Sequence, residues 1–159
     1  MAGSKQQDGL TVVQGSIVEV FSDGARLLGL PKSVGEIYGL LYASKEPQSL
    51  DDLVSRLDVS KGTGSQGLKM LRTLGAVKVA SGEDSRKTFY EADIELKSLV
   101  GGFIREQVRP HLDSAKGKIA TLKEEAKEDE FLQVRIDKLE TWRKKAALVL
   151  PVVQKFLGS

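Results

Sequence analysis

The 159-residue sequence contains no cysteine and a single histidine, His111. Disulfide bonds and cysteine-ligated zinc are therefore excluded, and a lone histidine cannot form a metal cluster. The absence of cysteine fits a reducing compartment, so we expect a cytoplasmic protein that needs neither a metal nor a cofactor. No nucleophile is paired with His111 in the sequence and no pair of carboxylates stands out, so we do not expect an enzyme.

Long hydrophobic runs are also lacking. The apolar stretch Ala146–Val153 is far too short to span a bilayer, and the polar start of the chain has no apolar segment of the kind that a signal peptide needs. We interpret residues 1–11 as a flexible tail. The next segment carries Glu19 and Asp23 among its polar residues, with Arg26 as the single base, a mixture that anionic lipid would not favour.

The net charge of +2 is unevenly distributed along the chain. Between Ser60 and Tyr90 there are six basic and two acidic residues, a local charge of +4, which leaves −2 for the remainder. A basic segment on a mildly acidic body is the electrostatic pattern of a protein that binds a polyanion, although an ordinary solvated surface would give the same count.

Apolar periodicity predicts four helices in the first half of the chain. The first two are expected at Val12–Leu28 and Lys32–Ser44. Ser49 to Asp52 is a capping-box variant that starts a short third helix, and Ser60 is a suitable cap for a fourth. The fourth helix is expected to end at Gly75 and to face inward with three leucines, Leu68, Leu71 and Leu74.

The period changes to that of a strand after Gly75. Residues 76–80 and 87–91 alternate between apolar and polar, and the six residues between them include Gly82 and Asp84, which predicts a β-hairpin with a polar tip. From Ile94 the chain is expected to be helical to about Ala126, with a kink or break at Pro110, and again from Glu130 to Leu157.

Two short helices joined by a tight turn and followed by a hairpin are typical of a winged helix-turn-helix. The predicted fold class is therefore mainly α with a small β-hairpin wing, flanked by long terminal helices. We expect residues 12–93 to form a DNA-binding domain and residues 94–159 to form a helical dimerisation region.

Several segments resemble the GbsR branch of the MarR family of transcription factors. They are Leu30-Pro-Lys-Ser-Val-Gly-Glu-Ile-Tyr-Gly-Leu-Leu-Tyr42, Ser49 to Leu57, Val59-Ser60-Lys-Gly-Thr63 and Leu71-Arg-Thr-Leu-Gly75. The resemblance implies a homodimer joined through its terminal helices, and often a small-molecule effector, which is choline for some members of the branch. Gly64 and Gly67 depart from the family pattern, and they predict a thinner and more flexible recognition helix.

A recognition helix enters the major groove with its N-terminal end, so its outward residues are the candidate DNA contacts. Gln66 has the donor and acceptor pair that matches adenine, whereas Lys61, Lys69 and Arg72 are interpreted as phosphate contacts. For any one of these side chains, ordinary surface is the alternative. The predicted DNA-binding residues are Ser60, Lys61, Thr63, Ser65, Gln66, Lys69, Arg72, Arg86 and Lys87.

The hairpin tip contains a short motif, Asp84-Ser85-Arg86, that resembles the Asp-x-Arg motif of MarR wings. The carboxylate can hold the guanidinium in one pose, and an arginine suits a narrow minor groove. The alternative is a solvated tip with an incidental ion pair.

The segment from Gly62 to Gly67 spells GxGxxG, which marks dinucleotide binding only when it follows a buried strand and opens a helix. Here an amphipathic helix and a turn are expected before Gly62, and the chain lacks the alternating strands and helices of a doubly wound sheet. We therefore do not expect nucleotide binding.

Two apolar stripes in the terminal helices need a surface to cover them. An isologous dimer is the commonest solution, and packing of the two helices on each other within one monomer is the alternative. The predicted dimer-interface residues are Leu99, Phe103, Leu139, Trp142, Ala146, Val149, Val153 and Phe156.

A ligand pocket between the helical layer and the DNA-binding domain is a further hypothesis. Its candidate walls are aromatic side chains that could hold a quaternary ammonium or form plain core, namely Phe21, Tyr38, Tyr42, Phe103 and Trp142. The sequence thus predicts a homodimeric regulator that binds specific double-stranded DNA, with no membrane partner. The rival hypothesis is a winged helix that serves as a protein–protein interaction module without binding DNA.

Overall fold

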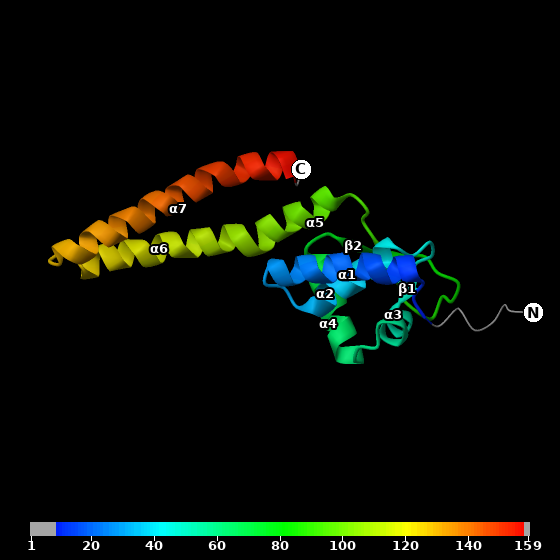
Figure 1. Cartoon of the computed structure of the whole chain (residues 1–159). Coiled ribbons are helices and arrows are strands. Elements are labelled where there is room, and N and C mark those ends of the chain that lie inside the picture. Colours follow the sequence, from blue (N-terminus) through cyan, green and yellow to red (C-terminus); the bar gives the residue numbers. More distant parts are fainter. Residues whose placement is uncertain (1–8, 158–159) are drawn as a thin grey trace, which may run out of the picture. The chain divides into compact units, whose positions relative to one another are not determined.

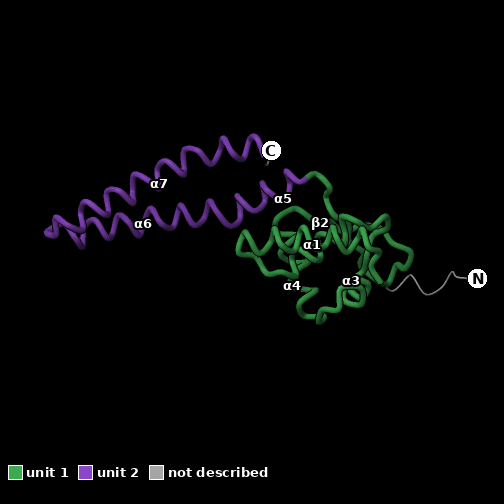
Figure 2. Tube along the Cα trace, viewed as in Figure 1, with its two compact units in different colours: residues 1–95 green, residues 96–159 purple. Residues whose placement is uncertain are grey.

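The structure is a computed structural model that describes residues 9–157, so most of the tail expected at residues 1–11 lies outside the described residues. The chain divides into two compact units, residues 1–95 and residues 96–159 (Figure 2). No helix among the described residues combines the length and the hydrophobicity needed to cross a bilayer.

Unit 1 combines short helices with a small antiparallel sheet (Figure 1). Its elements are α1 (Val12–Leu27), α2 (Lys32–Tyr42), β1 (Gln48–Ser49), α3 (Leu50–Leu57), α4 (Lys61–Thr73), β2 (Val77–Ala80) and β3 (Phe89–Ala92). The central strand of the sheet is β3, which pairs antiparallel with β1 on one side and β2 on the other. The predicted fold class, mainly α with a small β wing, is confirmed.

Side-chain caps fix where the helices of unit 1 begin. The Ser49 hydroxyl accepts the Asp52 N–H at 3.2 Å, and the Asp52 carboxylate accepts the Ser49 N–H at 2.8 Å, which completes the predicted capping box of α3. The Ser60 hydroxyl accepts the Thr63 N–H at 3.1 Å at the start of α4. Gly75 follows the end of α4 with a φ of +75°, a conformation that glycine adopts without strain.

The helices α1 and α2 approach each other closely because α2 places two glycines, Gly35 and Gly39, against α1. A Cβ on Gly39 would lie 2.9 Å from the Val18 Cα, and a Cβ on Gly35 would overlap the backbone of Phe21. The aromatic ring of Phe21 then packs edge-on against Tyr38, with 4.9 Å between the ring centroids. Backbone proximity and aromatic packing together make this helix pair the centre of the core of unit 1.

Tyr38 links this core to the end of the wing. Its side chain is fully buried, and its hydroxyl donates to the Asp93 carbonyl oxygen at 2.7 Å. The pKa of the Tyr38 hydroxyl is raised to about 12. The main cause is burial, and the negative charge of the nearby Asp93 carboxylate is the second cause.

The raised pKa of Tyr38 predicts a loss of stability in alkaline solution. In the unfolded chain a tyrosine releases its proton near pH 10, whereas the folded chain keeps it, so the unfolded state binds fewer protons between pH 10 and 12. The free energy of unfolding should therefore fall by up to about 1.4 kcal/mol per pH unit in this window. Urea unfolding at pH 8, 10 and 11 measures the slope. An equally steep slope in Tyr38→Phe would assign the loss to other groups.

The wing differs from the two-stranded hairpin that the sequence predicts. A third strand, β1, is present because Gln48 pairs with Tyr90 and Ser49 with Phe89, a contact that no local periodicity encodes. The loop between β2 and β3 has eight residues, 81–88, rather than six. Its turn is closed by the Lys87 N–H, which donates to the Asp84 carbonyl oxygen at 3.1 Å. Residues 77–92 are called the wing below.

Unit 2 is a helical hairpin in which α7 runs back alongside α6 (Figure 1). Its elements are α5 (Leu96–Phe103), the π-helical turn η1 (Ile104–Val108), α6 (Arg109–Glu125) and α7 (Glu130–Leu157). The helix expected to kink or break at Pro110 is interrupted by η1, which ends at Val108, two residues before that proline. Proline lacks an N–H and its ring crowds the carbonyl four residues earlier, here that of Glu106, so the wider π turn accommodates it.

The face that α7 turns toward α6 is partly polar. Arg143 donates to both carboxylate oxygens of Glu140, at 2.6 and 3.0 Å, and the two side chains are only 11% and 12% exposed. The Arg143 guanidinium holds the pKa of Glu140 below its usual value. By contrast, Trp142 of the predicted apolar stripe is 68% exposed and Phe156 is 82% exposed. The two helices do pack on each other, but this contact leaves most of the stripe uncovered.

Candidate DNA interface

The candidate interface begins with the turn that joins α3 to α4. Asp58 adopts the left-handed conformation at the end of α3, with a φ of 53°, and Ser60 caps α4 two residues later. The turn has only three residues, 58–60, which limits the angle between α3 and α4. Helix α4 also packs on α2 and α3, and this packing fixes its orientation in unit 1. Leu68 and Leu71 are buried as predicted, so the opposite side of α4 faces solvent.

Gly64 and Gly67 lie on the buried side of α4, not on its exposed side. A Cβ on Gly64 would lie 2.9 Å from Leu50 Cδ1 and 3.1 Å from Val54 Cγ2, and a Cβ on Gly67 would overlap the end of the Ile37 side chain. The departure from the family pattern is therefore explained by close packing: α3 and α2 supply the side chains that fill this space. Because both glycines are buried, the exposed face of α4 keeps all of its side chains.

The same geometry excludes the dinucleotide-binding interpretation of the GxGxxG segment. Gly62 lies in the first turn of α4, and α3 with its three-residue turn precedes it. A dinucleotide fold would need a buried strand leading directly into the first glycine.

The predicted recognition residues are displayed along α4. Lys61, Ser65, Gln66, Lys69 and Arg72 are all exposed. Thr63 is half-buried, and its hydroxyl accepts from the Ser60 hydroxyl at 2.8 Å. Ser60 and Thr63 therefore form the cap of the helix, while the exposed side chains are available to a ligand.

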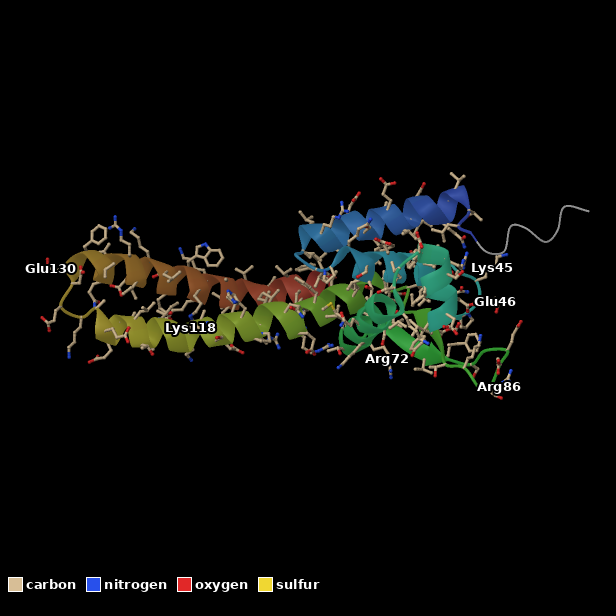
Figure 3. All side chains as sticks on the ribbon, turned by 90° about the horizontal axis from the view of Figure 1, so that it is seen from below. Lys45, Glu46, Arg72, Arg86, Lys118 and Glu130 are labelled. Atoms are coloured by element: carbon tan, nitrogen blue, oxygen red, sulfur yellow. The ribbon has the colours of Figure 1, made fainter. Side chains whose placement is uncertain are left out.

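Asp84 and Arg86 form a bidentate ion pair at the tip of the wing. The Arg86 Nε donates to Asp84 Oδ1 at 3.1 Å, and a second guanidinium nitrogen donates to Oδ2 at 3.2 Å. The Arg86 N–H also donates to Asp84 Oδ1, at 2.9 Å. These contacts lower the pKa of Asp84 and hold the arginine in one orientation. The Arg86 side chain is 87% exposed. Figure 3 shows Arg86 at the end of the wing loop.

The aromatic residues proposed for a ligand pocket fall into two groups. Phe21, Tyr38 and Tyr42 lie in unit 1 and contact each other, with centroid separations between 4.9 and 6.0 Å. Tyr38 is buried in the core, whereas Phe21 is half-buried and Tyr42 is 37% exposed. Phe103 and Trp142 belong to unit 2. The ligand pocket stays a prediction. Among residues 9–157 there is no cluster of side chains suited to holding a metal ion.

The structure adds one basic residue that the sequence analysis assigned only to a strand. Lys78 is exposed on β2, which borders a groove between α4 and the wing that Lys69 and Arg72 line. The sequence pattern that indicates the exposure of Lys78 is the alternation of the strand: a polar residue between Val77 and Val79 must face away from the core.

A helix-turn-helix followed directly by an antiparallel wing defines the winged helix-turn-helix fold. A solved structure described as a transcriptional regulator has this fold, with a TM-score of 0.68 and 19% identity, covering 91% of this chain and 95% of its own. No protein-family profile matches the chain.

Two curated relatives come from Bacillus subtilis (strain 168). The HTH-type transcriptional repressor GbsR is 31% identical over 77 residues, which is 48% of this chain and 42% of GbsR. YvaV, whose name places it among HTH-type transcriptional regulators, is 23% identical over 91 residues, 55% of this chain and 51% of its own length. The chain thus spans about half the length of the curated relatives that it matches, and these relatives are regulators.

Proposed function

We propose that the protein is a homodimeric transcriptional regulator that binds specific sequences in double-stranded DNA. The observation that carries the proposal is the exposed basic and amide face of α4 beside a wing tip whose arginine is fixed by Asp84. The regulator names of the two relatives support it.

In this proposal α4 enters the major groove with its N-terminal end. Gln66 then presents its amide to a base edge, where a donor and an acceptor together match adenine. Lys61, Lys69 and Arg72 contact phosphates, which fixes the register of the helix but carries little sequence information. The buried side of α4 packs closely against α2 and α3 at Gly64 and Gly67. This packing fixes the position of the exposed side chains of α4 relative to the rest of unit 1.

The wing is proposed to contact the adjacent minor groove through Arg86. An arginine inserted into a narrow minor groove meets a strongly negative potential. Because both carboxylate oxygens of Asp84 hold the guanidinium, less conformational entropy is lost when DNA binds.

This role of Asp84 gives a prediction of unusual sign. Asp84→Asn removes a negative charge from a DNA-binding surface, yet we expect about fivefold weaker DNA affinity, since Arg86 loses its fixed pose at a cost of about 1 kcal/mol. Glu83→Gln is the matched control, because it removes the same charge from the preceding residue and leaves the contact between Asp84 and Arg86 intact. DNA affinity of this variant should stay equal to that of the wild type or rise slightly. Fluorescence anisotropy with labelled duplex measures both. Equal effects of the two variants would assign Asp84 no part in positioning Arg86.

The homodimer is proposed to form through the apolar stripe of α7. Leu139, Trp142 and Val149 are substantially exposed, because the polar Glu140–Arg143 pair occupies the side that faces α6. An uncovered stripe at three- and four-residue spacing is suited to helix–helix association. A two-fold dimer would present two copies of α4 to successive major grooves, about 34 Å apart.

The salt dependence of binding tests the proposed function against a protein-interaction module. A protein that contacts several phosphates releases a similar number of counterions, so the logarithm of its affinity falls linearly with the logarithm of salt concentration, with a slope of about −0.9 per phosphate. We expect a slope of about −4 or steeper from the basic residues of α4 and the wing. A chain that shows no shift of duplex DNA at low salt would instead be an interaction module.

A further inference from the structure

A pocket in unit 1 lies apart from the groove between α4 and the wing, and the two share no lining residue. It has a volume of about 480 Å³ and is bounded by the start of α1, the end of α2, β1 and α3. Figure 3 labels Lys45 and Glu46, which line the pocket in the segment after α2. Other polar side chains that line it are those of Thr11, Gln14, Gln48 and Arg56.

This pocket contains a guanidinium without a negatively charged partner. Arg56 of α3 is half-buried, and no carboxylate of the described residues lies within ion-pair distance of it. Its Nη1 donates to Gln48 Oε1 at 3.0 Å, and its Nη2 donates to Gln14 Oε1 at 3.1 Å. Both acceptors are neutral amides, which orient the cation but do not neutralise it. A partly buried charge is costly unless an opposite charge pairs with it.

Arg56 also keeps donors that no described residue uses. A guanidinium carries five N–H groups, and the two glutamine oxygens accept from two of them. The Nε of Arg56 is buried and has no hydrogen-bond partner among the described residues. The glutamines are themselves held, because Gln14 Nε2 donates to the Ala43 carbonyl oxygen at 3.2 Å and Gln48 Nε2 to that of Glu46 at 2.9 Å. The arginine is thus oriented in advance for an acceptor with a negative charge.

The charges around the pocket set the charge of its ligand. Lys45 is a second cation, and no described carboxylate lies within ion-pair distance of it. Glu46 is the acidic residue of the lining, so together with Arg56 the three side chains carry a net charge of +1. A monoanion neutralises this charge, whereas a dianion would leave an excess of negative charge beside Glu46.

The uncharged part of the lining sets the shape of the ligand. Val13, Ile17 and Ala43 give the pocket an apolar wall, which is suited to a short alkyl chain. The Thr11 hydroxyl accepts the Gln14 N–H at 3.1 Å and keeps its own proton, which it can donate to a ligand oxygen. The lining therefore combines cationic and hydroxyl donors with apolar surface.

We propose that this pocket binds a small aliphatic monocarboxylate, whose carboxylate pairs with Arg56 and whose alkyl chain lies against Val13 and Ile17. The site differs from the predicted aromatic pocket, which would hold a cation. It does not depend on the proposed function, because none of the predicted DNA contacts lines this pocket. A ligand held here would contact α1 and α3 together, and it would stabilise unit 1 in proportion to its occupancy.

A titration of the full chain with sodium butyrate at pH 7 and constant ionic strength tests the proposal. Two-dimensional NMR should show saturable shifts of the amide signals of Thr11, Gln14 and Gln48, with a dissociation constant on the order of 1 mM, as expected for a ligand of this size. Sodium chloride at the same concentrations should not produce these shifts. Arg56→Gln should abolish them.

Gln14→Glu tests the same site without removing Arg56. It preserves the shape of the side chain and places a carboxylate within the chain opposite Arg56, so butyrate should bind at least tenfold more weakly. Helix α1 should stay folded, because glutamate is suited to this position of the capping box that begins at Thr11. Gln154→Glu is the matched control: Gln154 Oε1 accepts from Arg109 at 2.8 Å in unit 2, outside the pocket, so butyrate binding should be unchanged.

Three results would overturn the proposal. Shifts that do not saturate, or that chloride reproduces, would mean that the anion only screens an exposed charge. Equal butyrate affinity in wild type and Gln14→Glu would mean that Arg56 only joins α1 to α3. Tighter binding of inorganic phosphate than of butyrate would contradict the class of ligand. DNA affinity is measured separately, so none of these results decides the proposed function.

Discussion

Gly35→Ala is expected to lower the free energy of unfolding by about 3 kcal/mol or more. The added Cβ would overlap the Phe21 carbonyl oxygen and lie 2.8 Å from the Ser22 Cα. Both neighbours are backbone atoms of α1, so no side chain can rotate to make room. The helix itself must move, and the ring packing between Phe21 and Tyr38 is lost with it.

The matched control for this variant is Gly24→Ala, also within a helix. Nothing lies within 4 Å of a Cβ at Gly24, so the alanine should only improve helix propensity and stabilise the fold by about 0.5–1 kcal/mol. Urea unfolding followed by circular dichroism measures both variants. If the two alanines shift the midpoint in the same direction, the close approach of α1 and α2 is not as described.

Val149→Glu is expected to convert the proposed dimer into a monomer and to weaken binding to a palindromic site by 100-fold or more. Each dimer would bury this charge twice in an apolar contact, a desolvation cost that is large compared with an exposed ion pair. A monomer also loses the second half-site, which contributes a factor of about 10² to 10⁴ through effective concentration. Affinity for an isolated half-site should be unchanged, since Val149 lies in unit 2 and the proposed DNA contacts lie in unit 1.

Leu148→Glu provides the control, because Leu148 is adjacent in sequence and exposed but lies off the apolar stripe. This variant should remain dimeric and retain its affinity for the palindromic site. Sedimentation velocity gives the mass of both variants, and anisotropy gives their affinities. If Val149→Glu stays dimeric, the interface uses another surface.

The helices of unit 1 could be predicted because their signals are local. Ser49, Asp52 and Ser60 cap their helices through contacts within three residues along the chain, and Gly75 ends α4 by its own conformation. The leucines of α4 face inward at the spacing that any buried helix face requires. These features depend on neighbours along the chain, which the sequence shows directly.

The features that the sequence could not reveal depend on distant partners. β1 has two residues, too few for a periodic pattern, and it exists because Gln48 meets Tyr90. The two glycines of α4 look like missing side chains until Leu50, Val54 and Ile37 are seen to fill their space. The groove between α4 and the wing likewise joins residues of α4 with residues of two strands.

Unit 2 shows the same division. The apolar stripe of α7 was readable from its spacing, but the side that faces α6 was not, since the polar residues Glu140 and Arg143 occupy it. A pattern of hydrophobic residues identifies a face that needs covering, and it does not identify which neighbour covers it. The same holds for Pro110, whose effect appears as the π turn before it.

Selection of bound duplexes from random DNA tests the central claim most directly. The account predicts that wild-type protein enriches a pseudo-palindromic motif whose half-sites are about one helical turn apart. Gln66→Ala should enrich a related motif that has lost its preference at one position of each half-site. A wild-type protein that binds the pool but enriches no motif would contradict sequence-specific recognition by α4.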